Sequence, residues 1–375
     1  MRRGLDGEVL RVLRDAGPQT KNQLADFLGI PRTTLNASVR GLADAGHVED
    51  GSVAASSGGR RSVTVRISCG RRFLVLSMGE AAARVAVLDG QLTVTSGVNI
   101  DLQDRDPETE WLADTVCRAA QRLLGTQAPA ALGVAVADVE PAVAEAVVAR
   151  LASAYPDRPL ATVSAVRALA LGERGQGGTS AADDFVAIRL GRSVTTATVA
   201  GGRLAWGSTG RSGEIGHLRV EEFGPACACG LTGCLDSFVS SGALVTHATS
   251  LVRHGRPSEL AQVLEHAGTL DLRDLVAAAR AGDAVVAQVA RDLGQRLGRV
   301  VAGVVAHANP RRVVVGGPVA AMGPSFLGDL RATVYRLAPP LLAEGLEINL
   351  SDPDGPADLI GCASAAMTRW IEHDF

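Results

Sequence analysis

The chain has 375 residues, of which 46% are hydrophobic and 21% are charged, and its formal net charge at pH 7 is −3. This length predicts two or three domains, and the composition excludes a fibrous or disordered protein. No apolar run reaches the roughly 18 residues that a membrane span needs, and the start MRRGLDGEVL lacks the apolar core of a signal peptide. We therefore expect a cytoplasmic protein with no membrane partner.

Charge is distributed unevenly along the chain. The first 70 residues carry ten Lys and Arg against seven Asp and Glu, which leaves 27 against 33 for the remainder. A slightly basic head is therefore followed by an acidic body. A basic balance favours a nucleic-acid partner, but a balance this modest implies few phosphate contacts for each head.

Helical periodicity dominates the head. Apolar residues at helical spacing predict a helix from Leu5 to Arg14. Thr20 and Gln23 form a capping box for a short helix that Gly29 ends. A second helix is predicted over Pro31–Ala45. Two short helices joined by a tight turn that contains glycine indicate a helix-turn-helix.

Two segments with strand character, GHVEDGSV and RRSVTVRI, follow this motif and flank a loop that is typical of a wing. The head is thus predicted to be a winged helix-turn-helix DNA-binding domain over residues 1–68, whose second helix enters the major groove and whose wing reaches phosphates or the minor groove. The alternative is a winged helix that binds a protein. With few phosphate contacts, we expect two heads on a palindromic double-stranded operator. The candidate DNA-contacting residues are Arg32, Thr33, Thr34, Asn36, Arg40, Arg60 and Arg61.

Strands and helices alternate through the body in two groups, which predicts two α/β lobes over residues 69–183 and 184–375. The first lobe combines strands such as FLVLSMG and ALGVAVA with a helix over Pro107–Leu124. The second contains the strand DFVAIRLG, a hairpin that turns at Gly201 and Gly202, and a long helix over Asp283–Ala308. A cleft between two such lobes would hold a small ligand.

Three of the six cysteines fall within eight positions. Cys227, Cys229 and Cys234 form the pattern C-x-C-G-x-x-G-C, and His217 lies ten residues upstream of the first. Three thiolates and one imidazole complete a closed tetrahedral zinc site, which is structural, whereas a catalytic zinc keeps an open position. Gly230 and Gly233 allow the tight turns that such convergence needs. The alternative is a set of reduced core cysteines.

This motif, together with GEIGH, NPRRVVVGGPV and LIGCASAAM, resembles the transcriptional regulators of the ROK family (repressor, open reading frame, kinase) along nearly the whole chain. The resemblance implies a two-lobed actin-like and hexokinase-like (ribonuclease H-like) body, assembled as a homodimer or homotetramer. It also implies that a sugar changes the affinity of the protein for its operator. Because the family contains sugar kinases as well, individual residues have to separate the enzyme from the repressor.

Three replaced positions argue against a kinase. The family's catalytic Asp, which follows an Asn, is replaced by Ala165 after Ser164, and a methyl group takes no proton. The first phosphate loop begins with Ser77 instead of Asp and has Glu80 and Ala81 in place of its second Gly and Thr. Ser193 stands in the second phosphate loop, which keeps only its first glycine. We therefore expect no enzymatic activity, no catalytic residues and no bound ATP.

For the sugar pocket, the resemblance implies contacts from Glu214, His217 and Asp236, with Asp236 in place of the family's usual Glu. The partners from the other lobe are replaced by Ser164 and Ala165. Three hypotheses remain. The cleft senses a modified sugar or a glycosylated or less polar metabolite, or the body serves only dimerisation or the binding of a protein partner, or the protein is a residual sugar kinase or isomerase.

Overall fold

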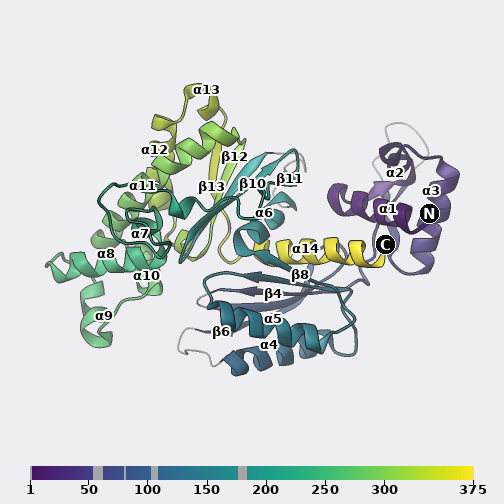
Figure 1. The fold of residues 1–375 in the computed structure, drawn as a ribbon, viewed down its shortest axis with the longest axis horizontal. Helices are drawn as coiled ribbons and strands as arrows, with labels where there is room; N and C mark the ends of the chain where they lie inside the picture. Colours follow the sequence, from purple (N-terminus) through teal and green to yellow (C-terminus); the bar gives the residue numbers. More distant parts are fainter. Residues whose placement is uncertain (1, 54–61, 80–81, 103–108, 176–183) are drawn as a thin grey trace. The chain divides into compact units, whose positions relative to one another are not determined.

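The computed structural model describes residues 2–53, 62–79, 82–102, 109–175 and 184–375 (Figure 1). The chain forms two compact units. Unit 1 contains Met1–Gln176 and Pro356–Phe375, and unit 2 contains Gly177–Gly355. Unit 1 is therefore built from two separate stretches of the sequence.

Unit 1 opens with three helices and a small antiparallel sheet, in strand order β1-β3-β2. The elements are α1 (Arg2–Ala16), β1 (Gln19–Thr20), α2 (Lys21–Leu28), α3 (Arg32–Asp44), β2 (Val48–Val53) and β3 (Val63–Ile67). The predicted capping box is confirmed, because Thr20 accepts from the Gln23 amide and the Gln23 side chain accepts from the Thr20 amide. Gly29 ends α2 in the left-handed conformation, at a φ of 63°. Pro31 is the N-cap of α3, so this helix begins one residue later than predicted.

A five-stranded mixed sheet forms the rest of unit 1, in strand order β6-β5-β4-β7-β8. Its strands are β4 (Phe73–Met78), β5 (Ala82–Leu88), β6 (Val94–Asp101), β7 (Ala131–Val136) and β8 (Leu160–Ser164). Its helices are α4 (Thr109–Leu124), α5 (Pro141–Ala154), α6 (Ala165–Gly175) and α14 (Ala357–Asp374). β4 and β7 are parallel, as are β7 and β8, whereas β5 pairs antiparallel with both of its neighbours.

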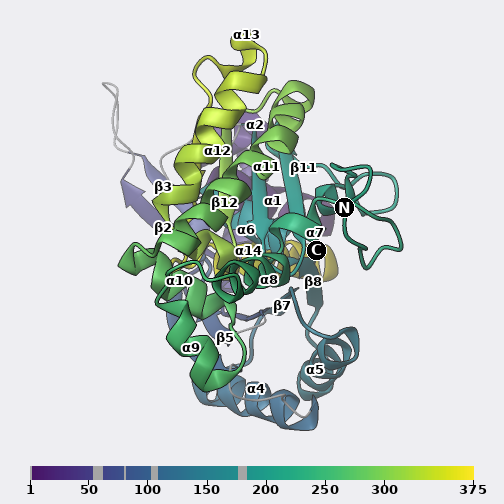
Figure 2. The ribbon, with the colours of Figure 1, turned by 90° about the vertical axis from the view of Figure 1, so that its left-hand side faces the viewer.

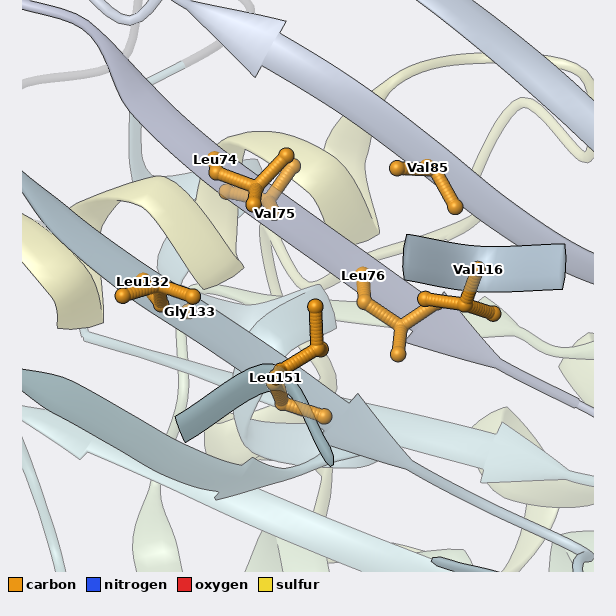
Figure 3. A pocket seen from close by; sticks show the side chains of 9 residues that line it. Leu74, Val75, Leu76, Val85, Val116, Leu132, Gly133 and Leu151 are labelled. Atoms are coloured by element: carbon orange, nitrogen blue, oxygen red, sulfur yellow. The ribbon is translucent and has the colours of Figure 1, made fainter. Parts of the chain in front are cut away.

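Helices cover both faces of this sheet, so β4 is buried along its whole length. Successive side chains of a strand point to opposite faces. Leu74 and Leu76 accordingly belong to the core under α4 and α5, whereas Phe73 and Val75 belong to the core under α14. Figure 2 shows α4 and α5 on one side of the strands and α14 on the other. The small gap under α4 and α5 is lined by apolar side chains alone and offers no polar group to a ligand (Figure 3).

The position of α14 differs from the predicted division into lobes, which assigned residues 184–375 to the second lobe. The structure places α14 in unit 1, in contact with α6, β4, β7 and β8. The reason is a close approach of the helix to the sheet: a Cβ on Gly133 of β7 would lie 2.2 Å from the carbonyl oxygen of Cys362. Trp370 near the end of α14 is fully buried in the same core. The helix that closes the sequence thus completes the unit that the first residues begin.

Unit 2 has its own five-stranded sheet, in strand order β11-β10-β9-β12-β13. Its strands are β9 (Phe185–Leu190), β10 (Val194–Ala200), β11 (Arg203–Leu204), β12 (Arg312–Gly316) and β13 (Glu347–Leu350). Its helices are η1 (Ile215–His217), α7 (Asp236–Val239), α8 (Ser241–Arg253), α9 (Leu260–Ala267), α10 (Leu272–Ala281), α11 (Ala284–Ala308), η2 (Pro318–Met322), α12 (Pro324–Leu337) and α13 (Pro340–Ala343).

Two sequence predictions in unit 2 are confirmed. The β10–β11 hairpin turns at Gly201 and Gly202, both at positive φ. The long helix α11 ends at Ala308 as predicted and has Asp283 as its N-cap. Buried side chains of α11 and α12 join those of β9 and β12 in one core. This core supports the loop between η1 and α7, which carries the candidate metal ligands.

Candidate metal centre and nucleic-acid interface

The four predicted metal ligands converge in unit 2. His217 ends η1, and the three cysteines lie on the loop that leads to α7; the ligand atoms of all four lie within 4.8 Å of one another. Cys227 Sγ is 3.6 Å from His217 Nδ1, and Cys229 Sγ is 3.6 Å from Cys234 Sγ. A tetrahedral zinc site with ordinary bond lengths needs about 3.6 Å between N and S and about 3.8 Å between two S atoms. The donor set and its spacing therefore fit zinc.

Glycines give this loop its shape. Gly230 and Gly233 have φ values of 89° and 71°, in the left-handed region, which agrees with the tight turns predicted at these two positions. A Cβ on Gly233 would also lie 1.9 Å from the carbonyl oxygen of Glu221, so a larger residue cannot occupy this position without moving the loop. The close spacing of the sulfur atoms is thus built into the backbone.

The three thiols differ in their environment. Cys234 is fully buried, and the loss of hydration raises the pKa of its thiol to about 12. Cys229 is exposed, and a hydrogen bond from the backbone of Leu231 lowers the pKa of its thiol. A buried thiol with a raised pKa is a metal ligand only when the cation itself displaces the proton. Such a site is closed to solvent on one side, which suits a structural ion better than a catalytic one.

Residues 218–235, between η1 and α7, form the metal loop. Arg296 of α11 anchors this loop to the core of unit 2. Its guanidinium forms an ion pair with Glu221 and lies over the ring of Phe238, 4.3 Å from the ring centroid. The two contacts lie on either side of the cysteine motif along the sequence. Sequence reasoning missed Arg296 because the partners are 75 residues apart for the ion pair and share no local pattern.

Asp236 follows the last cysteine by two residues and turns into the protein. Only 8% of its surface is exposed. Its Oδ2 accepts a hydrogen bond from Ser193 Oγ, and its Oδ1 accepts one from the Val194 amide, each at 2.7 Å. His217 Nδ1 lies 3.8 Å from Oδ2. The carboxylate thus joins the metal loop to the start of β10.

The room for this carboxylate comes from Gly216 in GEIGH. A Cβ at this position would lie 2.1 Å from Asp236 Oδ1. The second glycine of the motif was therefore the sequence signal for a buried group beside it, although nothing in its pattern named Ser193 or Val194 as partners. Glu214, two residues earlier, is exposed at the N-cap of η1.

The candidate DNA contacts gather on one face of α3 in unit 1. Its opposite face buries Leu35, Val39 and Leu42 in the head. Ser38 on α3 donates a hydrogen bond to Asp6 on α1, which fixes the rotation of α3. The five predicted residues on the outer face are all exposed, namely Arg32, Thr33, Thr34, Asn36 and Arg40. The two predicted wing residues, Arg60 and Arg61, lie outside the described residues.

The ROK family sequence model matches residues 76–352, which is more than half of the chain. The chain belongs to the ROK family. NagC of Escherichia coli K12, a DNA-binding transcriptional dual regulator, is 24% identical over 333 residues that cover 83% of this ROK chain and 79% of NagC. A glucokinase of Halalkalibacterium halodurans is 34% identical over 193 residues, which cover 51% of this chain and 58% of the enzyme. The chain thus spans little more than half of that glucokinase.

Solved structures establish the actin-like, hexokinase-like α/β fold of this ROK protein. A ROK family transcriptional regulator, a homologue of the E. coli MLC protein, superposes with a TM-score of 0.78 at 23% identity and covers 99% of this chain and 97% of its own. A ROK family glucokinase from Streptomyces griseus, in complex with glucose and AMPPNP, gives a TM-score of 0.65 at 24% identity, with 79% and 99% covered. Among the described helices, none has both the length and the apolar character to cross a membrane.

The positions that bear on ROK kinase chemistry lie at strand ends. Ser164 ends β8 and is exposed, and Ala165 begins α6. Ser77 on β4 is 9% exposed and pairs in register with Arg84 on β5. Neither Ser164 nor Ala165 carries a group that accepts a proton near neutral pH. Glu80 and Ala81, which the resemblance places in the first phosphate loop, lie outside the described residues.

Arg84 on β5 makes a contact that the sequence analysis did not predict. Its Nη1 lies 2.9 Å from Asp358 Oδ1, in the first turn of α14. A carboxylate near the N-terminus of a helix is stabilised by the helix dipole. The ion pair between Arg84 and Asp358 therefore ties β5 to α14. It lies close to Ser77, because Ser77 pairs in register with Arg84.

Proposed function

We propose that this ROK chain is a DNA-binding transcriptional regulator that represses from a palindromic operator through an N-terminal winged helix-turn-helix. The observation that carries the proposal is the face of α3 with five exposed polar and cationic side chains, held at a fixed rotation by Leu35, Val39 and the Ser38–Asp6 hydrogen bond. Short donors on an exposed helix face are what the major groove accepts. The likeness to NagC over 333 residues supports the same assignment.

The body is proposed to lack kinase activity, although the family includes glucokinases. A kinase of this fold needs a general base and a phosphate loop whose backbone is free to approach the nucleotide. Ala165 stands at the position that the resemblance gives to the base. At the second phosphate loop, the Ser193 hydroxyl and the Val194 amide both bond to Asp236, so these donors already have an acceptor within the protein. We therefore expect this chain not to use ATP as a substrate.

The four-residue cluster is proposed to hold one structural zinc ion. Its ligands would be His217, Cys227, Cys229 and Cys234, and the ion would neutralise the thiolates and fix the loop that leads to α7. With Nδ1 of His217 turned to the cysteines, its proton would remain on Nε2, where it can be donated to a ligand. The zinc therefore would act by orienting side chains.

For the effector, we propose that the body does not bind an unmodified hexose tightly. Of the three contacts that the resemblance implies, Asp236 is already engaged by two donors of its own chain. Ser164 and Ala165 cannot supply the paired hydroxyl contacts of Asn and Asp, at about 1 to 3 kcal/mol for each hydrogen bond lost. A modified sugar, a less polar metabolite or no small molecule at all is consistent with these residues. Calorimetry with a panel of hexoses and pentoses tests this, and tight binding of an unmodified sugar would contradict it.

The regulator assignment is tested by selecting duplexes from random DNA with the purified full chain and measuring their affinity by gel shift. Arg32→Ala and Thr34→Ala are expected to weaken binding, with a loss on the order of 5- to 150-fold for each base contact removed. Arg256→Ala, which removes an exposed arginine on unit 2, is the matched control and should bind normally. Unchanged affinity in both α3 variants would sink the assignment of α3 to the major groove.

The assembly and the kinase exclusion are checked on the same preparations. Sedimentation should give the same oligomer for wild type and both α3 variants, because α3 acts at the DNA. An ATP-turnover assay with the sugar panel should give no product. Turnover that appears with any sugar and disappears in Glu214→Ala would establish a kinase instead.

A further inference from the structure

The backbone passes between the two units at two places, after Gln176 and after Gly355. Two helices of unit 1 flank these passages. α6 ends at Gly175, immediately before the first, and α14 begins at Ala357, just after the second. The two connections between the units therefore continue directly into α6 and α14.

These two helices are in backbone contact. A Cβ on Gly172 of α6 would lie 1.8 Å from the carbonyl oxygen of Ala357, and a Cβ on Gly361 of α14 would lie 1.8 Å from that of Ala168. Two glycines, one from each helix, thus remove the side chains that would keep the axes apart. Interiors packed this closely transmit displacement rather than absorb it. α6 and α14 consequently move as a pair.

α14 leads from this pair to the head (Figure 1). It has 18 residues, which corresponds to about 27 Å at the rise of an α-helix. Near its end, Trp370 is fully buried, with its ring centroid 5.5 Å from that of His47 in the head and 6.0 Å from that of Phe73 in β4. Arg14 of α1 also donates to Thr368 Oγ1 at 3.0 Å. The cores of the head and the sheet are continuous through α14.

Trp370 reaches the end of α3 through Arg71. The Arg71 guanidinium lies 5.8 Å from the Trp370 ring centroid. It donates to the carbonyl oxygens of Ala45 and Gly46, at 2.9 and 3.0 Å, in the turn that follows α3. His47 comes next in the chain. Trp370 thus contacts both Arg71 and His47, the two residues that hold the turn after α3.

The rings of Trp370 and His47 are tilted by 39° in the contact between α14 and this turn. Trp370 Nε1 and His47 Nδ1 are buried and have no hydrogen-bond partner within the described part of the chain. Packed aromatic rings prefer particular relative orientations, so a displacement of one ring acts on the other. The contact of Trp370 with His47, which forms the joint between the head and α14, therefore rests on ring packing, and the Arg14–Thr368 hydrogen bond adds a second contact between the two.

From these contacts we infer that α14 carries rearrangements of unit 2 to α3, and that Trp370 is the positioning residue at the joint. The inference rests on the proposed function, because it describes how the DNA-binding surface is regulated. By reciprocity, DNA bound to α3 must alter the backbone of α6 through the same helix. This reverse direction can be measured without knowing the effector.

The experiment uses the full chain and a duplex selected from random DNA by the wild type. Hydrogen–deuterium exchange of the α6 amides is compared with and without the duplex. In the wild type we expect the exchange rates in α6 to change by about fivefold or more, the lower end of typical coupling. Trp370→Ala should still bind the duplex but lose this α6 response, whereas Trp370→Phe keeps a ring at the joint and should retain it.

Two further variants complete the design. His47→Ala breaks the joint from the head side with a smaller change and should also lose the α6 response, which covers the case in which Trp370→Ala does not fold. Trp206→Ala, which removes an exposed tryptophan of unit 2, should retain it. The inference is overturned if the duplex binds the wild type without an α6 response, or if the response persists without the joint. If selection recovers no duplex, the proposed function fails first, and the two failures are thereby distinguished.

Discussion

Ser193 donates its hydroxyl to the carboxylate of Asp236 across 2.7 Å, and this bond joins two segments that the resemblance assigns to different ligands. The resemblance places Ser193 in the second phosphate loop and Asp236 at a sugar contact. By the resemblance, Asp236 is shorter than the Glu of the family kinases, and Ser193 is bulkier than the glycine of their second phosphate loop. In this chain the two side chains form a hydrogen bond with each other. The bond therefore ties β10 to the metal loop, between two segments to which the resemblance assigns substrate contacts.

Removing this bond should destabilise unit 2. Ser193→Ala leaves Asp236 with the Val194 amide alone, and a hydrogen bond to a charged group contributes about 1.5 to 3 kcal/mol. We expect the free energy of unfolding in urea to fall by about 2 kcal/mol. Ser250→Ala, at an exposed serine of α8, is the control and should change stability by less than about 0.5 kcal/mol. Equal stability of the two variants would show that the bond contributes nothing.

Zinc removal gives a second prediction. Elemental analysis should find one zinc ion for each chain, and chelation should lower the melting temperature, because an ion present at a thousand times its dissociation constant adds about 4 kcal/mol of stability. Cys229→Ser should lose the ion and become insensitive to the chelator. Cys69→Ser, which changes a cysteine outside the cluster, should keep both properties. A wild-type chain prepared without chelators that contains no zinc would contradict the assignment.

Helical glycines provide a third, paired prediction. Gly361→Ala places a methyl group 1.8 Å from the Ala168 carbonyl oxygen, and α6 and α14 must separate to admit it. We expect a loss of about 3 kcal/mol or more, or a chain that does not fold. Gly303→Ala on α11 meets no atom within 4 Å and should stabilise the protein by up to about 1 kcal/mol through helix propensity. Opposite signs in thermal unfolding test the close packing of the helix pair directly.

The joint between the head and α14 should weaken in mild acid. Burial, followed by the charge of Arg71, lowers the pKa of His47 below its usual 6.5. Protonation of the folded protein is therefore disfavoured, so this contribution to stability is complete above pH 6.5 and is lost as the pH falls through the lowered pKa. Stability measured from pH 7.5 to 5 should decline through this group, and His47→Phe should reduce the decline. His254→Phe, at an exposed histidine, should leave the decline as in the wild type.

Features that depend on neighbouring residues were predictable from the sequence. The capping box of Thr20 and Gln23, the turn at Gly201 and Gly202 and the N-cap of α11 all involve partners within a few positions. The metal cluster was predictable for the same reason, because three of its ligands lie within eight residues and the glycines between them permit the turns. Interactions between residues close in the sequence determine these geometries, without contacts between distant elements.

Pairings across long stretches of sequence were not predictable. Asp236 was expected to face a sugar, and no periodic pattern indicated that Ser193, 43 residues away, would donate to it. The ion pair between Arg84 and Asp358 spans 274 residues. The placement of α14 depended on a close approach to Gly133 that only the folded sheet defines. In each case, the packing of elements that are distant in the sequence brings the two partners together.

Unit 1 is discontinuous in sequence, and this has a consequence for its biosynthesis. The ribosome makes the α3 surface first, but one face of the central sheet lacks α14 until residues 356–375 have been synthesised. Until then, Phe73, Val75 and the underside of the head have no helix to bury them. A nascent or shortened chain is therefore exposed to aggregation and to chaperones, and its head lacks its attachment. The core of unit 1 is therefore complete only after α14 has been synthesised.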